Sequence, residues 1–129
     1  MELGNGSINT ASAVLSLSHS GLFHYTLGGK DSTAVEKAKA QLQTKQLSAE
    51  AKVLIIDLDP FKQGFEDHTF DIIIATNSLY TVQNMDKALA NALKLLKPGG
   101  KLCLIEVTNP GLRLGIVLGC LPDWLRQVN

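Results

Sequence analysis

The sequence of 129 residues has no excess of either charge and no long apolar run. Its 12 Lys and Arg residues balance 12 Asp and Glu residues, so the formal net charge is zero. A chain without a basic block or stripe is not expected to bind nucleic acid or an acidic membrane surface as its main partner. The most apolar tract, 112–121, is interrupted by Arg113 and ends before Pro122, so it is too short to span a bilayer.

Cysteine is scarce as well. Cys103 and Cys120 are the 2 cysteines, and both lie in apolar runs without the spacing of metal ligands. This arrangement predicts buried free thiols rather than a disulfide, and it predicts no metal site. The sequence opens without a charged-then-apolar signal segment, so we expect a cytoplasmic protein.

The apolar residues, 45% of the sequence, support a single globular domain over residues 1–129. Runs rich in Val, Ile and Leu predict strands at 22–27, 52–58, 70–76 and 101–108. The last three runs are nearly continuous rather than alternating, which is typical of parallel strands that are covered on both faces.

Two helices are predicted between these strands. Thr33 and Glu36 have the spacing of a capping box, and the helix that follows places Val35, Ala38 and Leu42 on one face. A second helix is expected from Met85 to Lys97 and ends at Pro98-Gly99-Gly100. Its expected apolar face consists of Met85, Leu89, Leu93 and Leu96. Alternation of strands and helices predicts a doubly wound α/β sheet.

In such a sheet, ligands bind beyond the carboxyl ends of the strands. The segments in that position are 4–7, 28–31, 57–60, 77–81 and 106–109. Two glycines alternate at the first of them, within ELGNGS, and a third segment carries the acidic run DLDP. We therefore expect the functional residues to lie in these five segments.

From Phe65 onward the sequence resembles one family. The run KPGGKLCLIEVTNP and the tail RLG…LPDWL are similar to the C-methyltransferase domain of fungal highly reducing polyketide synthases. ELGNGS and HYTLGGKDSTAVEKAKAQL fit the earlier part of the same domain more loosely. The resemblance implies a mostly parallel, Rossmann-like class I methyltransferase sheet, with the first strand and the C-terminal hairpin lacking. Without its first, central strand, the remaining strand pairs are expected to close up or to leave unpaired edges.

The resemblance also implies a function. Members of this family transfer a methyl group from S-adenosylmethionine to the α-carbon of a β-ketoacyl chain, which an acyl carrier protein holds. The implied partners are that carrier-bound polyketide chain and a larger synthase or partner chain.

The family's cofactor loop reads approximately E-x-G-x-G-x-G. Glu2, Gly4 and Gly6 match it, whereas Ile8 stands at the third glycine, where a β-branched side chain is expected to crowd the ligand or displace the helix. The resemblance also implies an adenine-contacting carboxylate at Asp57 and a pocket-lining amide at Asn77. Each has an ordinary structural alternative, as a turn former and as a cap at a strand end.

The ribose-binding acid of the family aligns with Gly29. Asp31 lies two residues later, and we expect it to be an exposed loop residue rather than a ribose ligand.

The catalytic histidine of the family aligns with Tyr80, and its catalytic glutamate with Glu106. Tyrosine, with an ordinary pKa of about 10, is neutral at pH 7 and is a poor general base. His19, His24 and His68 are expected to lie at the surface or at a strand edge rather than to act as the base.

Two interpretations stay open. One is an S-adenosylmethionine-dependent C-methyltransferase, with Tyr80 and Glu106 as catalytic positions. The other is a non-catalytic remnant that acts as a structural or interaction module, with cofactor binding weakened or lost. A Rossmann-like NAD-binding domain is disfavoured, because no acidic residue ends the second strand.

Overall fold

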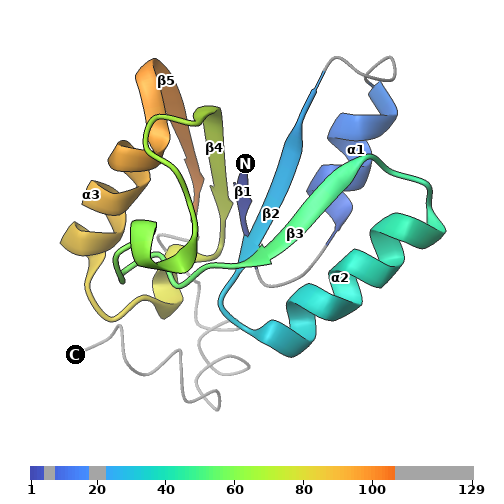
Figure 1. Ribbon diagram of the computed structural model, residues 1–129, viewed down its shortest axis with the longest axis horizontal. Helices are drawn as coiled ribbons and strands as arrows, with labels where there is room; N and C mark the ends of the chain where they lie inside the picture. The colour runs from blue at the N-terminus through green and yellow to red at the C-terminus, as the bar shows by residue number, and fades with distance from the viewer. Residues whose placement is uncertain (5–7, 18–22, 107–129) are drawn as a thin grey trace, which may run out of the picture.

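The computed structural model describes residues 1–4, 8–17 and 23–106 of the chain (Figure 1). The strands of this part form one five-stranded sheet in the order β3-β2-β1-β4-β5, and all neighbouring strands are parallel. They are β1 (Glu2–Leu3), β2 (Tyr25–Gly29), β3 (Ala49–Val53), β4 (Phe70–Thr76) and β5 (Leu96–Ile105). The predicted parallel α/β sheet is thus confirmed.

The centre of the sheet differs from the expectation. A short first strand is present, and the two strand pairs neither close up nor separate. Leu3 lies opposite Gly28 of β2 and Ala75 of β4, and the main-chain nitrogen of Met1 donates a hydrogen bond to the Ile72 carbonyl at 2.8 Å. Two residues of β1 are therefore sufficient to join the two halves of the sheet.

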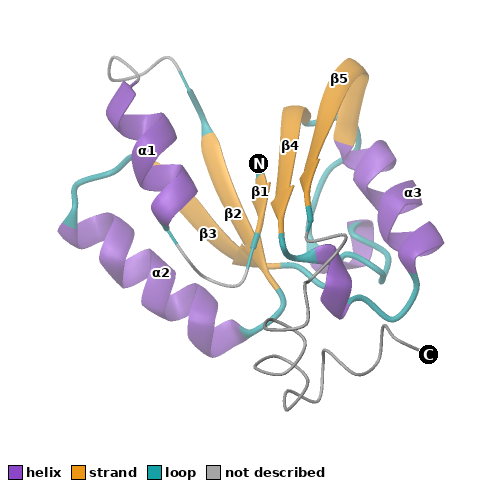
Figure 2. Ribbon diagram, turned by 180° about the vertical axis from the view of Figure 1, so that it is seen from behind, coloured by secondary structure: helices purple, strands orange, loops and turns teal. Residues whose placement is uncertain are grey.

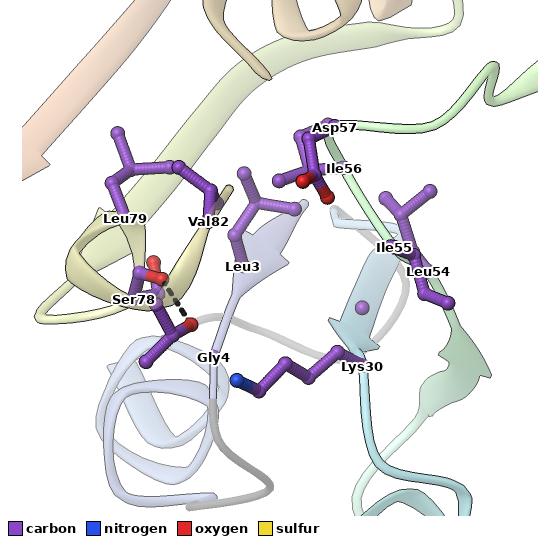
Figure 3. A pocket seen from close by; sticks show the side chains of 12 residues that line it. Leu3, Gly4, Lys30, Leu54, Ile55, Ile56, Asp57, Ser78, Leu79 and Val82 are labelled. Carbon is purple, nitrogen blue, oxygen red and sulfur yellow. Dashed lines mark hydrogen bonds between the residues drawn. The ribbon is translucent and has the colours of Figure 1, made fainter. Parts of the chain in front are cut away.

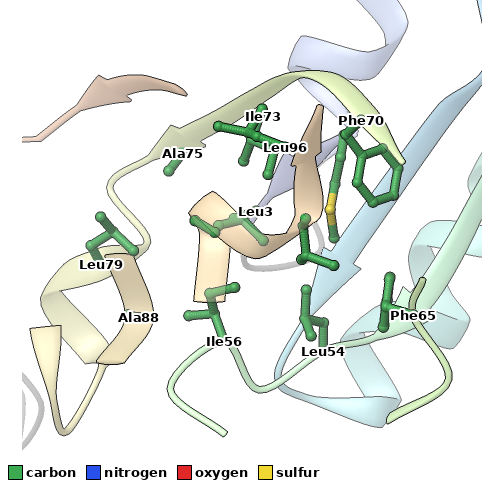
Figure 4. Packing of buried hydrophobic residues seen from close by; sticks show 13 residues of the cluster. Leu3, Leu54, Ile56, Phe65, Phe70, Ile73, Ala75, Leu79, Ala88 and Leu96 are labelled. Atoms are coloured by element: carbon green, nitrogen blue, oxygen red, sulfur yellow. The ribbon is translucent and has the colours of Figure 1, made fainter. Parts of the chain in front are cut away.

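Helices cover the two faces of the sheet separately (Figure 2). Helices α1 (Asn9–Leu17) and α2 (Ser32–Thr44) pack on β2 and β3, where Tyr25 and Leu27 belong to their hydrophobic cluster. Helix α3 (Met85–Leu95) contributes to a second cluster with Leu3 and Ile73 (Figure 4). Successive residues of a strand point to opposite faces, which explains why Leu3 and its neighbour Glu2 lie in different layers.

The predicted face of α2 is confirmed, because Val35, Ala38 and Leu42 are buried. The predicted capping box is wrong. Asp31, rather than Thr33, is the N-cap residue, and its carboxylate accepts hydrogen bonds from the amides of Thr33 and Ala34 at 2.8 and 3.4 Å. A carboxylate two residues earlier thus satisfies free amides of the first turn.

The predicted face of α3 is partly wrong. Leu89 packs against the core and Leu96, the first residue of β5, is buried, but Met85 and Leu93 are exposed. The buried residues of the helix itself are Ala88, Asn91, Ala92 and Leu95. Asn91 explains the difference in rotation, because its side-chain amide donates hydrogen bonds of 2.9 Å to the Ile56 and Leu58 carbonyls. A polar residue on the inner side was not expected from hydrophobic spacing.

The predicted strand at 52–58 is displaced to 49–53. The amide of Leu54 still donates a hydrogen bond to the Gly29 carbonyl, but beyond it the main chain of Ile55 bonds to the side-chain amide of Gln63 instead of a strand. Gln63 belongs to the short helix η1 (Phe61–Gln63). Leu54 and Ile56 therefore enter the core from a loop.

The predicted strand at 70–76 is confirmed as β4. The predicted strands at 22–27 and 101–108 correspond to β2 and β5, with shifted boundaries. Cys103 is exposed on β5, so its predicted burial is wrong, and Cys120 lies outside the described residues. None of the described helices has the length and apolarity that crossing a membrane requires.

Candidate functional site

A pocket of about 40 Å³ lies at the carboxyl edge of the sheet (Figure 3). It is placed where β1 meets β2 on one side and β4 on the other, which is the switch point at which ligands bind in open α/β sheets. Four of the five segments that the sequence predicted at the carboxyl ends of the strands contribute to its lining. The lining residues are Leu3, Gly4, Gly28, Lys30, Leu54, Ile55, Ile56, Asp57, Ser78, Leu79, Thr81 and Val82.

Asp57 is the predicted site residue that the structure places most clearly in the pocket. Its carboxylate accepts a hydrogen bond from the amide of Gln83 at 3.0 Å, which fixes the side chain against the segment after η2 (Leu79–Thr81). Leu79 and Val82 supply apolar wall beside it. A flat, apolar ring with polar edges, such as adenine, suits a pocket that combines apolar walls with one carboxylate.

Gly4 also lines the pocket, and its amide donates a hydrogen bond of 3.0 Å to the Gly28 carbonyl. The main chain thus passes close to the end of β2, as a cofactor loop does. Gly6 lies outside the described residues. Ile8 does not line the pocket, because its side chain is buried in the cluster that α1 and α2 form on β2; the expected displacement of the helix stays a prediction.

Glu2 and Asn77 do not line the described pocket. The carboxylate of Glu2 is buried and accepts a hydrogen bond of 2.6 Å from the hydroxyl group of Tyr25. Burial first, and then this hydrogen bond, raise the pKa of Tyr25 above its ordinary value. Asn77 is exposed and has a φ of 45°. Its main-chain N–H donates a hydrogen bond of 2.7 Å to the Ile105 carbonyl. Left-handed backbone is well tolerated by asparagine, so this residue turns the chain as it leaves β4.

The end of β2 carries no acidic side chain that faces the pocket. A Cβ atom on Gly29 would lie 3.0 Å from Cγ2 of Val35 and 3.3 Å from the Gly4 carbonyl oxygen, so a side chain there would require these neighbours to shift by a few tenths of an ångström. The carboxylate of Asp31 caps α2, as described above, which agrees with the non-ligand role expected for it. Lys30 is instead the side chain that lines the pocket from this strand end.

Of the two predicted catalytic positions, Tyr80 lies in the turn after β4, and Glu106 follows β5 and reaches this turn with its carboxylate. Oε1 of Glu106 accepts hydrogen bonds from the main-chain amides of Ser78 and Leu79, at 3.0 and 2.9 Å. This carboxylate therefore holds the turn that carries Tyr80. Tyr80 itself is half-buried, and it is not among the residues that line the pocket.

Neither histidine of the described part of the chain lines the pocket. The imidazole of His24 is 75% exposed and 3.9 Å from Glu50, and Nδ1 of His68 lies 2.6 Å from the Leu96 carbonyl oxygen. His19 lies outside the described residues. The described residues also contain no group of three or more side chains suited to hold a metal ion.

Sequence reasoning missed two pocket residues. The hydroxyl group of Ser78 is buried without a hydrogen-bond partner among the described residues, which marks a polar position that a ligand is able to satisfy. Lys30 was not predicted as a site residue because it follows Gly29, the position that aligns with the ribose-binding acid of the family. Ser78 directly follows Asn77, a predicted pocket residue, and this position was a signal in the sequence that Ser78 also lies at the pocket.

Comparison with known proteins agrees with this geometry. A family described as methyltransferase domain matches residues 2–104. The chain belongs to this methyltransferase family. The methyltransferase domain is 38% identical over 125 residues to fusarielin synthase FSL1 of Gibberella zeae, and 35% identical over 125 residues to the highly reducing polyketide synthase verA of Penicillium polonicum. These matches cover 96% of the chain but 5% of each relative, so the chain spans a small part of their length.

Solved structures extend the likeness to three dimensions. The CurJ carbon methyltransferase superimposes with a TM-score of 0.85 at 30% identity, over 97% of this chain and 33% of that one. The trans-methyltransferase CalH in complex with SAH gives 0.82 at 30% identity, over 95% and 36%. The methyltransferase domain described here thus resembles the carbon methyltransferases in both sequence and fold.

Proposed function

We propose that the chain is a C-methyltransferase domain of the polyketide synthase type in which methyl transfer is impaired. The reaction of this type moves a methyl group from S-adenosylmethionine to the α-carbon of a β-ketoacyl chain on an acyl carrier protein, within a larger synthase. The pocket at the carboxyl edge of β1 and β2 carries this proposal, because it lies at the switch point of a methyltransferase fold.

The pocket suits one part of the cofactor. Asp57 offers a carboxylate for the adenine ring, and Leu54 and Val82 offer apolar contact. The buried hydroxyl group of Ser78 gives a further polar contact. When bound, the cofactor supplies a methyl group that is activated by a positively charged sulfur atom.

The ribose side of the pocket suits the cofactor poorly. Gly29 leaves no carboxylate to accept hydrogen bonds from the ribose hydroxyl groups, and Lys30 adds a positive charge near the position of a cationic cofactor. The volume of 40 Å³ is also far below the roughly 300–1,000 Å³ that is typical of small-molecule sites. These three features support weak cofactor binding.

The catalytic positions support impairment independently. Removal of a proton from the α-carbon needs a base whose pKa lies near the working pH, and Tyr80 replaces the histidine of the family. Glu106, the retained acid, accepts main-chain hydrogen bonds from Ser78 and Leu79. It positions the turn, and no histidine of the described residues is placed there for it to orient.

Titration with S-adenosylmethionine tests the proposal. We expect calorimetry to give a dissociation constant of about 1 mM or weaker, equivalent to about −4 kcal/mol. In parallel, ¹⁵N NMR at millimolar ligand should shift the amide signals of Leu3, Asp57 and Leu79, with the unrelated surface residue Lys101 as the control. A micromolar dissociation constant would overturn the impairment, and shifts confined to residues outside the pocket would overturn the assignment of the site.

The second candidate is a non-catalytic module within a synthase. Tyr80 at the position of the family's histidine and Gly29 at that of its ribose-binding acid favour it, because a fold without these two groups would keep a structural role. Complete absence of NMR shifts at saturating S-adenosylmethionine and S-adenosylhomocysteine, in a chain with native circular dichroism, would select this candidate over the first.

A further inference from the structure

The end of β2 determines which side chain reaches the ribose side of the pocket. Gly29 ends the strand without a side chain, and its Cα is closely flanked by Val35 on one side and by the Gly4 carbonyl group on the other. Asp31 begins α2, with its carboxylate bound to the first amides of that helix. Lys30, between them, is left as the one side chain of the segment 29–31 that lines the pocket.

The charge of Lys30 is not neutralised by a neighbour in the described part of the chain. No carboxylate of these residues forms an ion pair with its ammonium group, in contrast to Lys52 and Lys97, which pair with Glu50 and Asp71 at 2.9 Å. Figure 3 shows the Lys30 side chain extending towards Gly4, with Asp57 at the opposite end of the pocket. The pocket therefore has a negative end at Asp57 and a positive end at Lys30.

We propose that Lys30 determines ligand specificity, so that the pocket prefers an adenosine ligand that carries a negative group on its ribose over one with free ribose hydroxyl groups. Dinucleotide-binding folds follow the same chemical rule at the end of their second strand, where a carboxylate accepts hydrogen bonds from the ribose hydroxyl groups and a cationic side chain binds a ribose phosphate. The inference rests on the proposed adenosine pocket and adds to it the class of ligand and the residue that selects it.

The test compares two probes that differ in one phosphate group. Adenosine and adenosine 2′-monophosphate are titrated into the wild-type protein and followed by NMR at the amides of Leu3, Asp57 and Leu79. Because Lys30 is exposed, we expect the 2′-phosphate to bind about three- to fivefold tighter at low ionic strength, and we expect this preference to shrink at 0.5 M salt.

The variant Lys30→Glu should reverse the preference. Its carboxylate repels the 2′-phosphate and accepts hydrogen bonds from the ribose hydroxyl groups, so adenosine and S-adenosylmethionine should each bind about three- to tenfold tighter than they bind to wild type. Lys101→Glu is the matched control, because it makes the same change in net charge on β5, away from the pocket lining. Asp31→Ala is a second control, and it should lower stability without changing the preference.

The possible failures are distinguishable. If neither wild type nor Lys30→Glu shows adenosine-dependent shifts at the three pocket amides, the adenosine pocket itself is wrong. If both proteins bind adenosine there but share the same preference for the 2′-phosphate, or if Lys101→Glu changes the preference as much as Lys30→Glu, the role of Lys30 is wrong. Urea denaturation of each variant confirms that it is folded during the titrations.

Discussion

At the scale of single residues, Glu106 limits the effect that replacing Tyr80 by histidine has on methyl transfer. Its Oε1 atom accepts the amides of Ser78 and Leu79, so the turn before Tyr80 is held by this carboxylate. We expect Tyr80→His alone to give no methyl transfer to a β-ketoacyl thioester above the background rate. Under the proposed weak cofactor binding, which rests on Lys30 and on the absence of a carboxylate at Gly29, restoring the base alone is insufficient. Mass spectrometry of the thioester product provides the measurement.

The double variant Tyr80→His/Lys30→Glu is the matched comparison. Turnover in the double variant but not in the single one would agree with a defect in both base and cofactor site. Turnover in the single variant would show that the cofactor site is adequate, and the proposal of weak cofactor binding would then be abandoned.

Tyr25 allows a prediction about pH. Its hydroxyl group donates to Glu2 at 2.6 Å inside the protein, and burial together with this bond raises the pKa of Tyr25. The folded state therefore keeps its proton at pH values where the unfolded state, with a pKa of about 10, has lost it. This contribution to stability is complete below pH 10 and is lost as the pH rises above that value.

Tyr25→Phe should remove that alkaline loss. It should also lower the free energy of unfolding at pH 8 by about 1–3 kcal/mol, because the Glu2 carboxylate stays buried without its partner. Urea denaturation at pH 8 and at pH 10.5 measures both effects, with Tyr80→Phe as the control. An equal loss of stability at high pH in Tyr25→Phe and wild type would contradict the assignment.

At the scale of elements, the sequence predicted those whose signal is local. β4 was found with its boundaries because five of its seven residues, Phe70 and 72–75, are apolar. The inner face of α2 was found because hydrophobic spacing alone determines it. Gly4 was placed in the pocket because it directly follows β1, whereas Asp57, four residues after β3, was placed there by the family resemblance.

The elements that were missed depend on partners distant in the sequence. The rotation of α3 is set by Asn91, which bonds to carbonyl groups 33 and 35 residues away. β3 ends early because Gln63 bonds to the main chain of Ile55 eight residues before it. The same reason applies to Lys30, whose importance follows from the space around Gly29, and no one-dimensional pattern contains that information.

At the scale of the whole molecule, β1 connects two hydrophobic clusters that lie on different faces of the sheet. Leu3 is 4% exposed and belongs to the cluster with α3, while the neighbouring Glu2 reaches Tyr25 in the cluster with α1 and α2. A cavity of about 180 Å³ lies near β2 and β4, lined in part by Thr26 and Phe70. β1 is therefore the main link between the half of the sheet with β2 and β3 and the half with β4 and β5.

This arrangement predicts that damage at Leu3 spreads across the sheet. Leu3→Ala should lower the free energy of unfolding by about 2–5 kcal/mol, the usual cost of removing a buried leucine side chain. Leu58→Ala, at a side chain that is 55% exposed, is the control and should change it by about 0.5 kcal/mol or less. Native-state hydrogen exchange should then report the same loss of protection for Leu27 in β2 as for Ile73 in β4, since both strands depend on β1 for pairing. Loss confined to β4 and β5 would instead mean that the half formed by β2, β3 and their helices is stable by itself, and that β1 joins two independent units.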